Sequence, residues 1–427
     1  ISQPMARALY SRIMLYMASD RFRSESGISW QQAADAAQSF MTDYGTLYGL
    51  YTTDTDPKTC YTNAILKNAH DEKNNETIFW RNDVAVGWGA IYNDTPVGEG
   101  GNGGLCPSQN LVDMYDMANG QSPFSSYDET GAPVYNGTAT PAINNTSGYK
   151  SNDPYSNRDP RLAATVLYNG VNWGNGIINV LKGQRDNPQG NANATPTGYY
   201  TRKYIPEVIL NNNHTGSNYR NWIIIRYAEI LLNYAEALNE AGGSRTDVLN
   251  AIQPLRDRVG MTAKLTDRSD LQTIADRRNF IRKERTVELA FEDHRAWDVR
   301  RWNVAEKALA RPIYGMEITK ENGKFVYDFI GGRIGWGQGS ESGNLNEIAG
   351  AAGMSIVKTP LNDIFNAVQK LNGNYEEDIA QAEDIGGIVM GYVSIASSQP
   401  GMVTCQAQDD TYLREALEND CETCLLY

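Results

Sequence analysis

The chain has 427 residues, of which 41% are hydrophobic and 21% charged, so it is long enough to bury a sizeable core and lacks the composition of a disordered protein. Its formal net charge of −13 argues against a nucleic-acid or anionic-membrane partner, and no basic patch offsets that charge. No apolar run is long enough for a transmembrane helix, so we expect none.

Two N-terminal segments, Met5–Ala18 and Trp30–Tyr44, carry apolar residues at helical spacing. Pro4 stands at a first-turn position of the first segment, and Ser29 is a suitable N-cap for the second, which Gly45 ends. Two helices joined by a short polar loop predict a helical hairpin.

The segment from Tyr51 to Tyr219 differs in composition and in periodicity. Gly, Asn, Pro, Asp and Ser dominate it, helical periodicity disappears and aromatic residues become frequent. Long ordered loops tend to carry function, so a ligand site is expected in this segment.

Two aromatic groups in this segment are candidate sugar-binding residues. A sugar stacks its C–H face on an aromatic ring, while amides and carboxylates hold its hydroxyls. The flanking Gly87 and Gly89 suggest an exposed turn for the first group, and Gly170 and Gly174 flank the second. The candidates are Trp80, Arg81, Asn82, Asp83, Trp88 and Tyr92 in the first group and Asn172 and Trp173 in the second. For each Trp the alternative is burial in the core.

A second helical pair is predicted further along the chain. The segment Asn221–Ala241 has one apolar stripe at helical spacing, and Gly242 and Gly243 supply a left-handed stop. Thr246–Val259, closed by Gly260, completes the hairpin.

A helix is also predicted for Asp270–Ala290, where both signs of charge mix with apolar residues. A charge that leaves water needs a partner, so we expect internal ion pairs and a structural role. The residues concerned are Arg226, Glu229 and Glu236 in the preceding helix and Arg285, Glu288 and Arg301 in this charged segment and its sequel. Glu288 and Glu292 are one helical turn apart. This spacing favours ion pairing with Arg285 or Arg295 over a role in acid–base catalysis. Asp159, before Pro160, is expected in a structural turn.

Enzymatic motifs are not found. The three His residues occur in no HExxH motif and pair with no GxSxG nucleophile, and no cofactor or metal is expected. A glycosidase needs only two carboxylates across a cleft, and spacing in sequence does not exclude that. We expect that the protein is not an enzyme.

The amino-acid sequences of several segments resemble those of one protein family. The phrases are NNETIFW, LVDMYDMANG, NRDPRLAATVLYNG, GYYTRKY, IIIRYAEILLNYAEALNEAG and IRKERTVELAFEDHRAWDVRRW, in that order. Together they resemble the SusD/RagB family of outer-membrane nutrient-binding lipoproteins, over roughly residues 1–325.

The resemblance implies a mostly α-helical fold in which TPR-like hairpins carry long irregular ligand-binding loops, with few short strands. It implies a cell-surface protein of the outer membrane that binds an oligosaccharide and passes it to a SusC-like TonB-dependent transporter. Contact with the membrane would be only through a lipid anchor that this sequence does not contain. The alternatives are a relative that binds peptide or another nutrient, a glycan-degrading enzyme, and a helical scaffold without a small ligand.

The resemblance divides the chain into a SusD-like domain, 1–330, and a C-terminal extension, 331–427. The family's N-terminal helical region and its aromatic C-terminal tail are not found, so the first domain is expected to lack its N-terminal part. Cys421 and Cys424 form a lone CxxC near the end of the chain, for which we expect no function.

Overall fold

The structure, a computed structural model of the chain, describes residues 2–67, 74–87, 93–135, 140–207, 217–309, 311 and 313–331. The α-helices are α1 (Gln3–Ala18), α2 (Arg23–Ser26), α3 (Trp30–Tyr44), α4 (Pro57–Leu66), α6 (Gln109–Val112), α7 (Pro160–Thr165), α8 (Tyr227–Glu240), α9 (Arg245–Asp257), α10 (Ile274–Glu288), α11 (Arg295–Arg301) and α12 (Ala305–Leu309). Single 3₁₀ turns are η1 (Val97–Glu99) and η3 (Leu265–Asp267). The strands are β1 (Thr77–Gly87), β2 (Val166–Leu167), β3 (Asn172–Trp173), β4 (Gly176–Ile177), β5 (Tyr200–Thr201), β6 (Ser217–Arg226), β7 (Tyr314–Glu321) and β8 (Lys324–Gly331).

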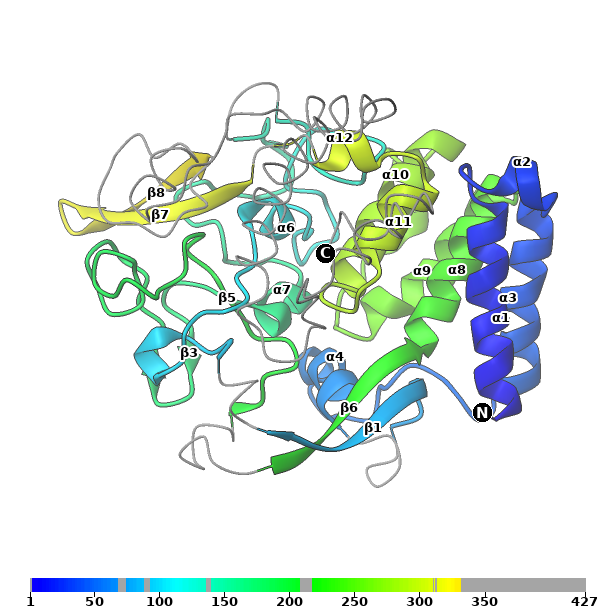
Figure 1. The fold of residues 1–427 in the computed structure, drawn as a ribbon. Coiled ribbons are helices and arrows are strands. Elements are labelled where there is room, and N and C mark those ends of the chain that lie inside the picture. Colours follow the sequence, from blue (N-terminus) through cyan, green and yellow to red (C-terminus); the bar gives the residue numbers. More distant parts are fainter. Residues whose placement is uncertain are drawn as a thin grey trace, which may run out of the picture. The chain divides into compact units, whose positions relative to one another are not determined.

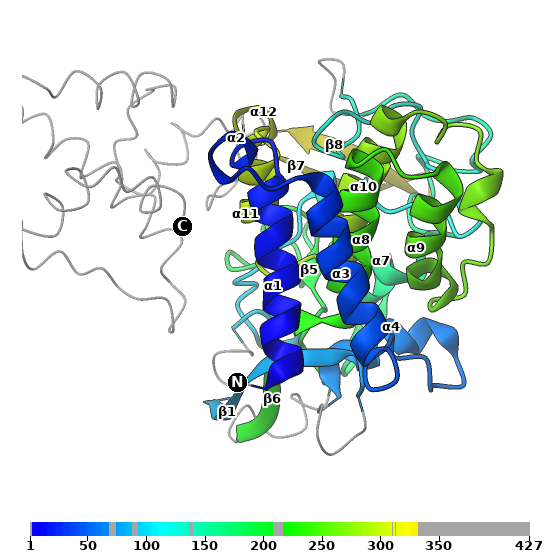
Figure 2. The same ribbon diagram turned by 90° about the vertical axis from the view of Figure 1, so that its right-hand side faces the viewer.

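The long helices pack side by side in one block (Figure 1). Helix α1 packs on α3, α3 packs on α8, and α8 also contacts α9 and α10. Figure 2 shows the hairpin of α1 and α3 standing beside α8 and α9. The loop-rich middle of the chain lies beside this block, with the β1–β6 sheet at one end (Figure 1). The mostly helical architecture with few strands is as predicted.

The N-terminal hairpin is confirmed. Helix α3 has the predicted bounds, and α1 begins at Gln3, two residues before the predicted start. Ser29 caps α3 in a capping box, in which its hydroxyl accepts from the backbone N–H of Gln32 and the Gln32 side chain accepts in return. The apolar stripes of the two helices meet in a cluster that includes Trp30.

The prediction of one helix over Asn221–Ala241 is wrong for its first six residues. They belong to β6, and α8 begins only at Tyr227. The run Ile223–Ile225 is β-branched and packs well on a pleated surface, so pairing with β1 overrides the helical stripe. Gly242, at φ 83°, ends the hairpin's first helix as predicted.

The other two predicted helices are present with shorter bounds. Helix α9 covers Arg245–Asp257, and α10 covers Ile274–Glu288. Thr273 caps α10 in a second capping box, with Asp276 as its partner, so the residues from 270 to 273 lie outside the helix.

Each sheet in the described part of the chain has two antiparallel strands: β1–β6, β2–β5, β3–β4 and β7–β8. The longest pair, β1–β6, aligns Arg81 with Trp222 and Trp80 with Ile223. Neither β1 nor the helix α4 before it is part of the sequence prediction.

The loop-rich half has a hydrophobic core of its own. Its buried cluster includes Trp173, Tyr199 and Tyr200 and is covered by the β7–β8 hairpin through Met316 and Ile318. This core explains how a segment with little regular structure keeps a fixed shape. Among the described helices, none combines the length and apolarity that crossing a membrane requires.

The predicted C-terminal extension, 331–427, lies outside the described residues except for Gly331. Cys421 and Cys424 lie there too. The domain division therefore stays a prediction.

Candidate functional site

Arg226, where β6 ends and α8 begins, is buried among three carboxylates. Its Nη1 lies 2.6 Å from Glu76 Oε1 and 2.7 Å from Glu288 Oε1. Its Nε lies 2.7 Å from Glu292 Oε2. Because a buried guanidinium is stable only with such partners, this cluster holds the end of α10 against the β1–β6 sheet.

Glu288 forms ion pairs with two further guanidinium groups. Arg161 Nη1 lies 2.9 Å from its Oε2, and Arg258 Nη2 donates to its Oε1. Burial by itself would raise the pKa of Glu288, but Arg258, Arg226 and Arg161 lower it well below its ordinary value. A carboxylate held ionised in this way is a poor general acid, which argues for the predicted structural role.

Ion pairing of Glu288 and Glu292 is therefore confirmed, but the predicted partners Arg285 and Arg295 are wrong. Helix α10 ends at Glu288, and Phe291 adopts φ 61°, so Glu292 is not one turn further along the same helix. Same-face spacing applies only inside a continuous helix.

Arg285 belongs to a second buried cluster. Its Nε lies 3.1 Å from Asp298 Oδ2 and 3.5 Å from Glu236 Oε2. Arg301 bridges the same two carboxylates, at 2.7 Å from Asp298 and 2.5 Å from Glu236. Glu229, also on α8, pairs with Arg12 of α1 at 2.6 Å. Together these ion pairs join helices α1, α8, α10 and α11.

Asp159 is structural, as predicted. Its carboxylate caps α7 by accepting from the backbone N–H of Arg161, whose Nη2 lies 2.6 Å from the same side chain. Pro160 follows at the first helical position, which suits its missing N–H.

Trp222 and Tyr204 build an exposed aromatic platform on the β1–β6 sheet. Their rings stack with centroids 5.4 Å apart and planes inclined by 21°. Trp222 remains 42% exposed, whereas Tyr204 is buried beneath it. Arg81 is the cross-strand neighbour of Trp222, so the exposed guanidinium side chain stands on the same face of the sheet.

Tyr204 has an unusual backbone conformation. Its φ of 68° lies in the left-handed region, which bulky residues rarely adopt. Such strain persists only when the surroundings enforce it, and it is common at ligand-binding sites. The ring of Tyr204 is thereby fixed as the base of the Trp222 platform.

A cavity of about 220 Å³ opens beside Tyr204. Its lining comes from α4, from the end of α7, from β3 and from the segment after β5. The lining residues are Tyr61, Thr62, Ile65, Leu66, Ala164, Trp173, Arg202, Lys203, Tyr204, Ile205, Pro206 and Glu207. It therefore combines apolar walls with a few polar groups, as small-molecule sites do.

Lys203 connects this cavity to the ion-pair clusters. Its ammonium donates to Tyr61 Oη at 2.7 Å, to Glu292 Oε1 at 2.7 Å and to the carbonyl of Glu288 at 3.2 Å. Burial lowers the pKa of Lys203 to about 8, although Glu292 opposes this effect. All three donors of the ammonium are used inside the protein.

The predicted site residues are only partly brought together. Trp80 is half-buried on β1 and, by strand alternation, faces away from Arg81 and Trp222. Trp173 is 1% exposed and packs in the core, so its predicted exposure is wrong, although it lines the small cavity. Asn82 and Asp83 lie in β1, not in an exposed turn, because pairing with β6 keeps this segment extended.

Trp88 and Tyr92 lie outside the described residues, and their binding role stays a prediction, as does that of the other candidates. Sequence analysis missed Trp222 because it assigned this residue to a helix. The β-branched run after Trp222 is the signal that could have placed it on a strand. No local sequence pattern pointed to Tyr204 as a site residue, because its stacking partner is distant in sequence.

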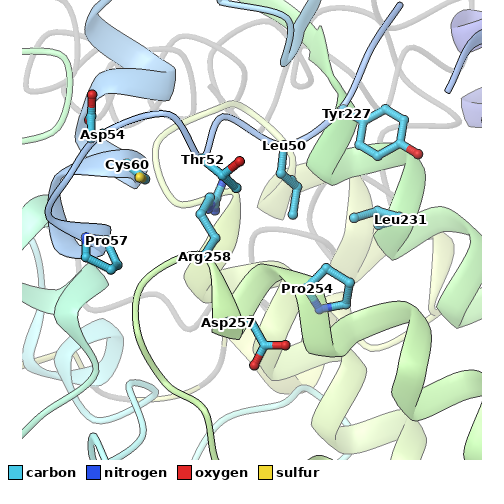
Figure 3. A pocket seen from close by; sticks show the side chains of 10 residues that line it. All are labelled: Leu50, Thr52, Asp54, Pro57, Cys60, Tyr227, Leu231, Pro254, Asp257 and Arg258. Atoms are coloured by element: carbon cyan, nitrogen blue, oxygen red, sulfur yellow. The ribbon is translucent and has the colours of Figure 1, made fainter. Parts of the chain in front are cut away.

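A larger cavity of about 570 Å³ lies between the helical block and α4 (Figure 3). It is lined by Leu50, Thr52, Asp54, Pro57, Cys60, Tyr227, Leu231, Pro254, Asp257 and Arg258. Two of its charged groups are already engaged: both terminal nitrogens of Arg258 bind carboxylates, and Asp54 accepts from Tyr51, Thr59 and Asn63. This cavity consequently offers a sugar fewer polar groups than its size suggests. In the part of the chain that the structure describes, no cluster of His, Cys, Asp and Glu has the arrangement of a metal site.

Comparison with known proteins agrees with this architecture. A sequence model of the SusD family matches residues 62–335. A curated relative, the SusD-like protein P2 of Formosa agariphila, is 34% identical over 102 residues, which are 23% of this chain and 20% of that protein.

Solved structures of SusD-like proteins share the fold. A SusD-like protein from Bacteroides fragilis is 26% identical with a TM-score of 0.57, and the match covers 77% of this chain and 59% of that one. A SusD-like carbohydrate-binding protein from the same species is 24% identical with a TM-score of 0.54, over 73% of this chain and 54% of that one. The chain thus spans between half and two thirds of the length of these structures, and a fifth of the curated relative.

Proposed function

Because the chain belongs to the SusD family, we propose that it is a cell-surface oligosaccharide-binding protein without catalytic activity, whose ligand stacks on Trp222. It captures the glycan at the outer membrane and delivers it to a SusC-like TonB-dependent transporter. We propose that a lipid anchor holds it at the membrane.

The observation that carries the proposal is the Trp222–Tyr204 stack. A sugar presents a C–H face that packs on an indole ring, and a ring held rigidly by a second ring loses little entropy when it binds. Arg81 stands on this face to meet hydroxyl groups, and the small cavity adjoins Tyr204, the ring that underlies Trp222. We propose that Asp83, Trp88 and Tyr92, which follow Arg81 along the chain, extend the platform, so that several sugar rings are bound.

The clustered carboxylates support binding over catalysis. A glycosidase needs one carboxyl group with a raised pKa to act as acid. Both carboxylates are buried and have lowered pKa values, because Arg258, Arg226 and Arg161 surround Glu288 and because Arg226 and Lys203 contact Glu292. A glycan-degrading enzyme would have to use other residues.

The test starts with a screen of the chain against an array of plant, algal and microbial oligosaccharides. Each hit is then titrated by calorimetry, and the mixture is analysed for shortened products after prolonged incubation. We expect saturable binding with the oligosaccharide recovered intact. Product formation would favour the enzyme, and binding of peptides with no oligosaccharide bound would favour the peptide-binding alternative.

The transporter partner is tested separately. The full-length protein is tagged in its native host, and the outer membrane is solubilised in mild detergent. Co-purification of a TonB-dependent transporter in stoichiometric amount is the expected result. Recovery of the protein alone, with its glycan affinity intact, would contradict the delivery step and leave the binding function standing.

A further inference from the structure

The β7–β8 hairpin carries an aromatic ring beyond the edge of the core. Its turn residues, Asn322 and Gly323, both have positive φ, 49° and 80°, as a two-residue turn that suits the twist of a hairpin requires. Phe325 and Tyr327 are two residues apart on β8 and therefore point to the same face of the hairpin. That face packs on the core at Tyr327, whereas Phe325, nearer the turn, remains 45% exposed.

Phe325 is the outer end of a run of four neighbouring rings. Its centroid lies 6.4 Å from that of Tyr327, which lies 5.8 Å from that of Tyr155. Tyr155 stacks on Tyr168 with centroids 4.3 Å apart, and its hydroxyl shares a hydrogen bond of 3.0 Å with that of Tyr199. One exposed Phe is ordinary, but four contiguous rings, all of them exposed or half-buried, form a platform of fixed shape.

Hydroxyl and carboxylate groups border this platform. The hydroxyls of Tyr168 and Tyr327 have no hydrogen-bond partner among the described residues, and both oxygens are accessible to solvent. Burial of the ring raises the pKa of Tyr327, and the charge of Asp153 raises it further, which places this exposed carboxylate near the hydroxyl. Asp153 accepts from Ser156 at 2.8 Å and forms no ion pair in the described part of the chain. The platform thus offers a ligand both donors and acceptors.

The charges beside the rings disfavour an ionic ligand. Asp153 repels an anion. Lys320, opposite Phe325 on β7, repels a cation, because its ammonium lies 5.7 Å from the centroid of that ring. The ligand that fits is neutral, with an apolar face and with groups that both donate and accept. A sugar ring has these properties, since its C–H face packs on aromatic rings and each of its hydroxyls donates and accepts.

We propose, on the basis of the oligosaccharide-binding function above, that the platform of Phe325, Tyr327, Tyr155 and Tyr168 is a second binding site for neutral sugar rings. Figures 1 and 2 show the β7–β8 hairpin and the β1–β6 sheet, which carries Trp222, at opposite ends of the loop-rich half. A short oligosaccharide therefore occupies the two sites independently, and one chain holds two oligosaccharide molecules.

The experiment counts the sites and assigns each to its aromatic residue. Hexasaccharides of starch, mixed-linkage β-glucan, xylan and mannan are titrated by calorimetry into the protein and into the Trp222→Ala variant. We expect at least one of these hexasaccharides to bind with a stoichiometry of two per chain. Trp222→Ala should weaken one of the two sites and leave the other with its affinity unchanged.

Phe325→Ala should weaken the remaining site by about tenfold or more and leave the Trp222 site unchanged. Tyr10→Ala on α1 is the matched control, because Tyr10 is an aromatic residue that is also 45% exposed, and it should change neither site. The double variant Tyr168→Phe with Tyr327→Phe keeps both rings and removes their hydroxyls. It should weaken the second site about fivefold or more. Melting curves establish that each variant is folded.

Each outcome separates the two proposals. One site per chain that only Trp222→Ala weakens, or equal effects of Phe325→Ala and Tyr10→Ala, would overturn the inference and leave the proposed function standing. One site that only Phe325→Ala weakens would keep the platform as a sugar site and remove Trp222 from the proposed function. Tighter binding of an oligolysine peptide than of any hexasaccharide, lost in Phe325→Ala, would assign the platform to basic peptides and overturn the inference. If none of the hexasaccharides binds, the inference fails, whereas the proposed function fails only if the oligosaccharide array also gives no hit.

Discussion

The indole of Trp222 rests on the ring of Tyr204, with their centroids 5.4 Å apart. The two residues come from β6 and from the turn after β5, so the platform exists only because two segments of the irregular half meet. The positive φ of Tyr204 shows that the surrounding structure enforces the arrangement.

Trp222→Ala should weaken oligosaccharide binding about thirtyfold, which corresponds to about 2 kcal/mol for a large aromatic anchor. Calorimetry measures the affinity. Trp297→Ala is the matched control, because Trp297 on α11 is 41% exposed and lies away from the β1–β6 sheet. Equal losses in the two variants, or no loss in the first, would remove Trp222 from the site.

Filling the small cavity should also weaken binding. Thr62 stands on α4 at the wall of the 220 Å³ cavity, and we expect Thr62→Trp to reduce affinity by about tenfold or more by excluding the ligand group. Thr52→Trp introduces the same bulk into the 570 Å³ cavity and should leave affinity unchanged. The reverse pattern would place the ligand in the larger cavity.

Arg285→Ala should lower stability without abolishing binding. The substitution leaves Asp298 and Glu236 with one guanidinium fewer inside the protein, at a cost of roughly 3–5 kcal/mol. Chemical denaturation measures the loss, and calorimetry on protein that remains folded measures affinity. Arg23→Ala, at the surface, should change neither quantity. Lost affinity at unchanged stability would show that Arg285 belongs to the ligand site.

The ion-pair clusters should make stability depend on pH in the acid range. Burial by itself would raise the pKa of Glu292, but Arg226 and Lys203 lower it from 4.5 to about 2. A carboxylate with a depressed folded-state pKa contributes stability that is present above the unfolded value and is lost as pH falls through the folded value. The contribution of Glu292, about 3 kcal/mol, should therefore disappear between pH 4.5 and about 2.

The check uses the Glu292→Gln variant as a difference measurement, because other carboxylates titrate in the same range. Denaturation curves of both proteins are recorded from pH 7 downward. The gap between their free energies of unfolding should be largest above pH 4.5 and should close as pH falls. A difference that is independent of pH would mean that the charge of Glu292 contributes nothing to the free energy of unfolding.

The sequence by itself determined the helical block. Apolar residues every three to four positions bury one side of a helix whatever surrounds it, so α3 was predicted with its bounds, including the Ser29 cap. The need of each buried charge for a partner was equally predictable, since it follows from desolvation. The family resemblance joined these features into one fold.

Tertiary structure decided what no local pattern encodes. Residues 221–226 became a strand because β1 was available to pair with β6, and Arg226 found three carboxylates from two distant segments. For the same reason Trp173 entered the core, whereas Trp222 stayed exposed on Tyr204. Whether an aromatic ring in a loop is buried depends on which other segments fold over it, and long-range contacts alone settle that.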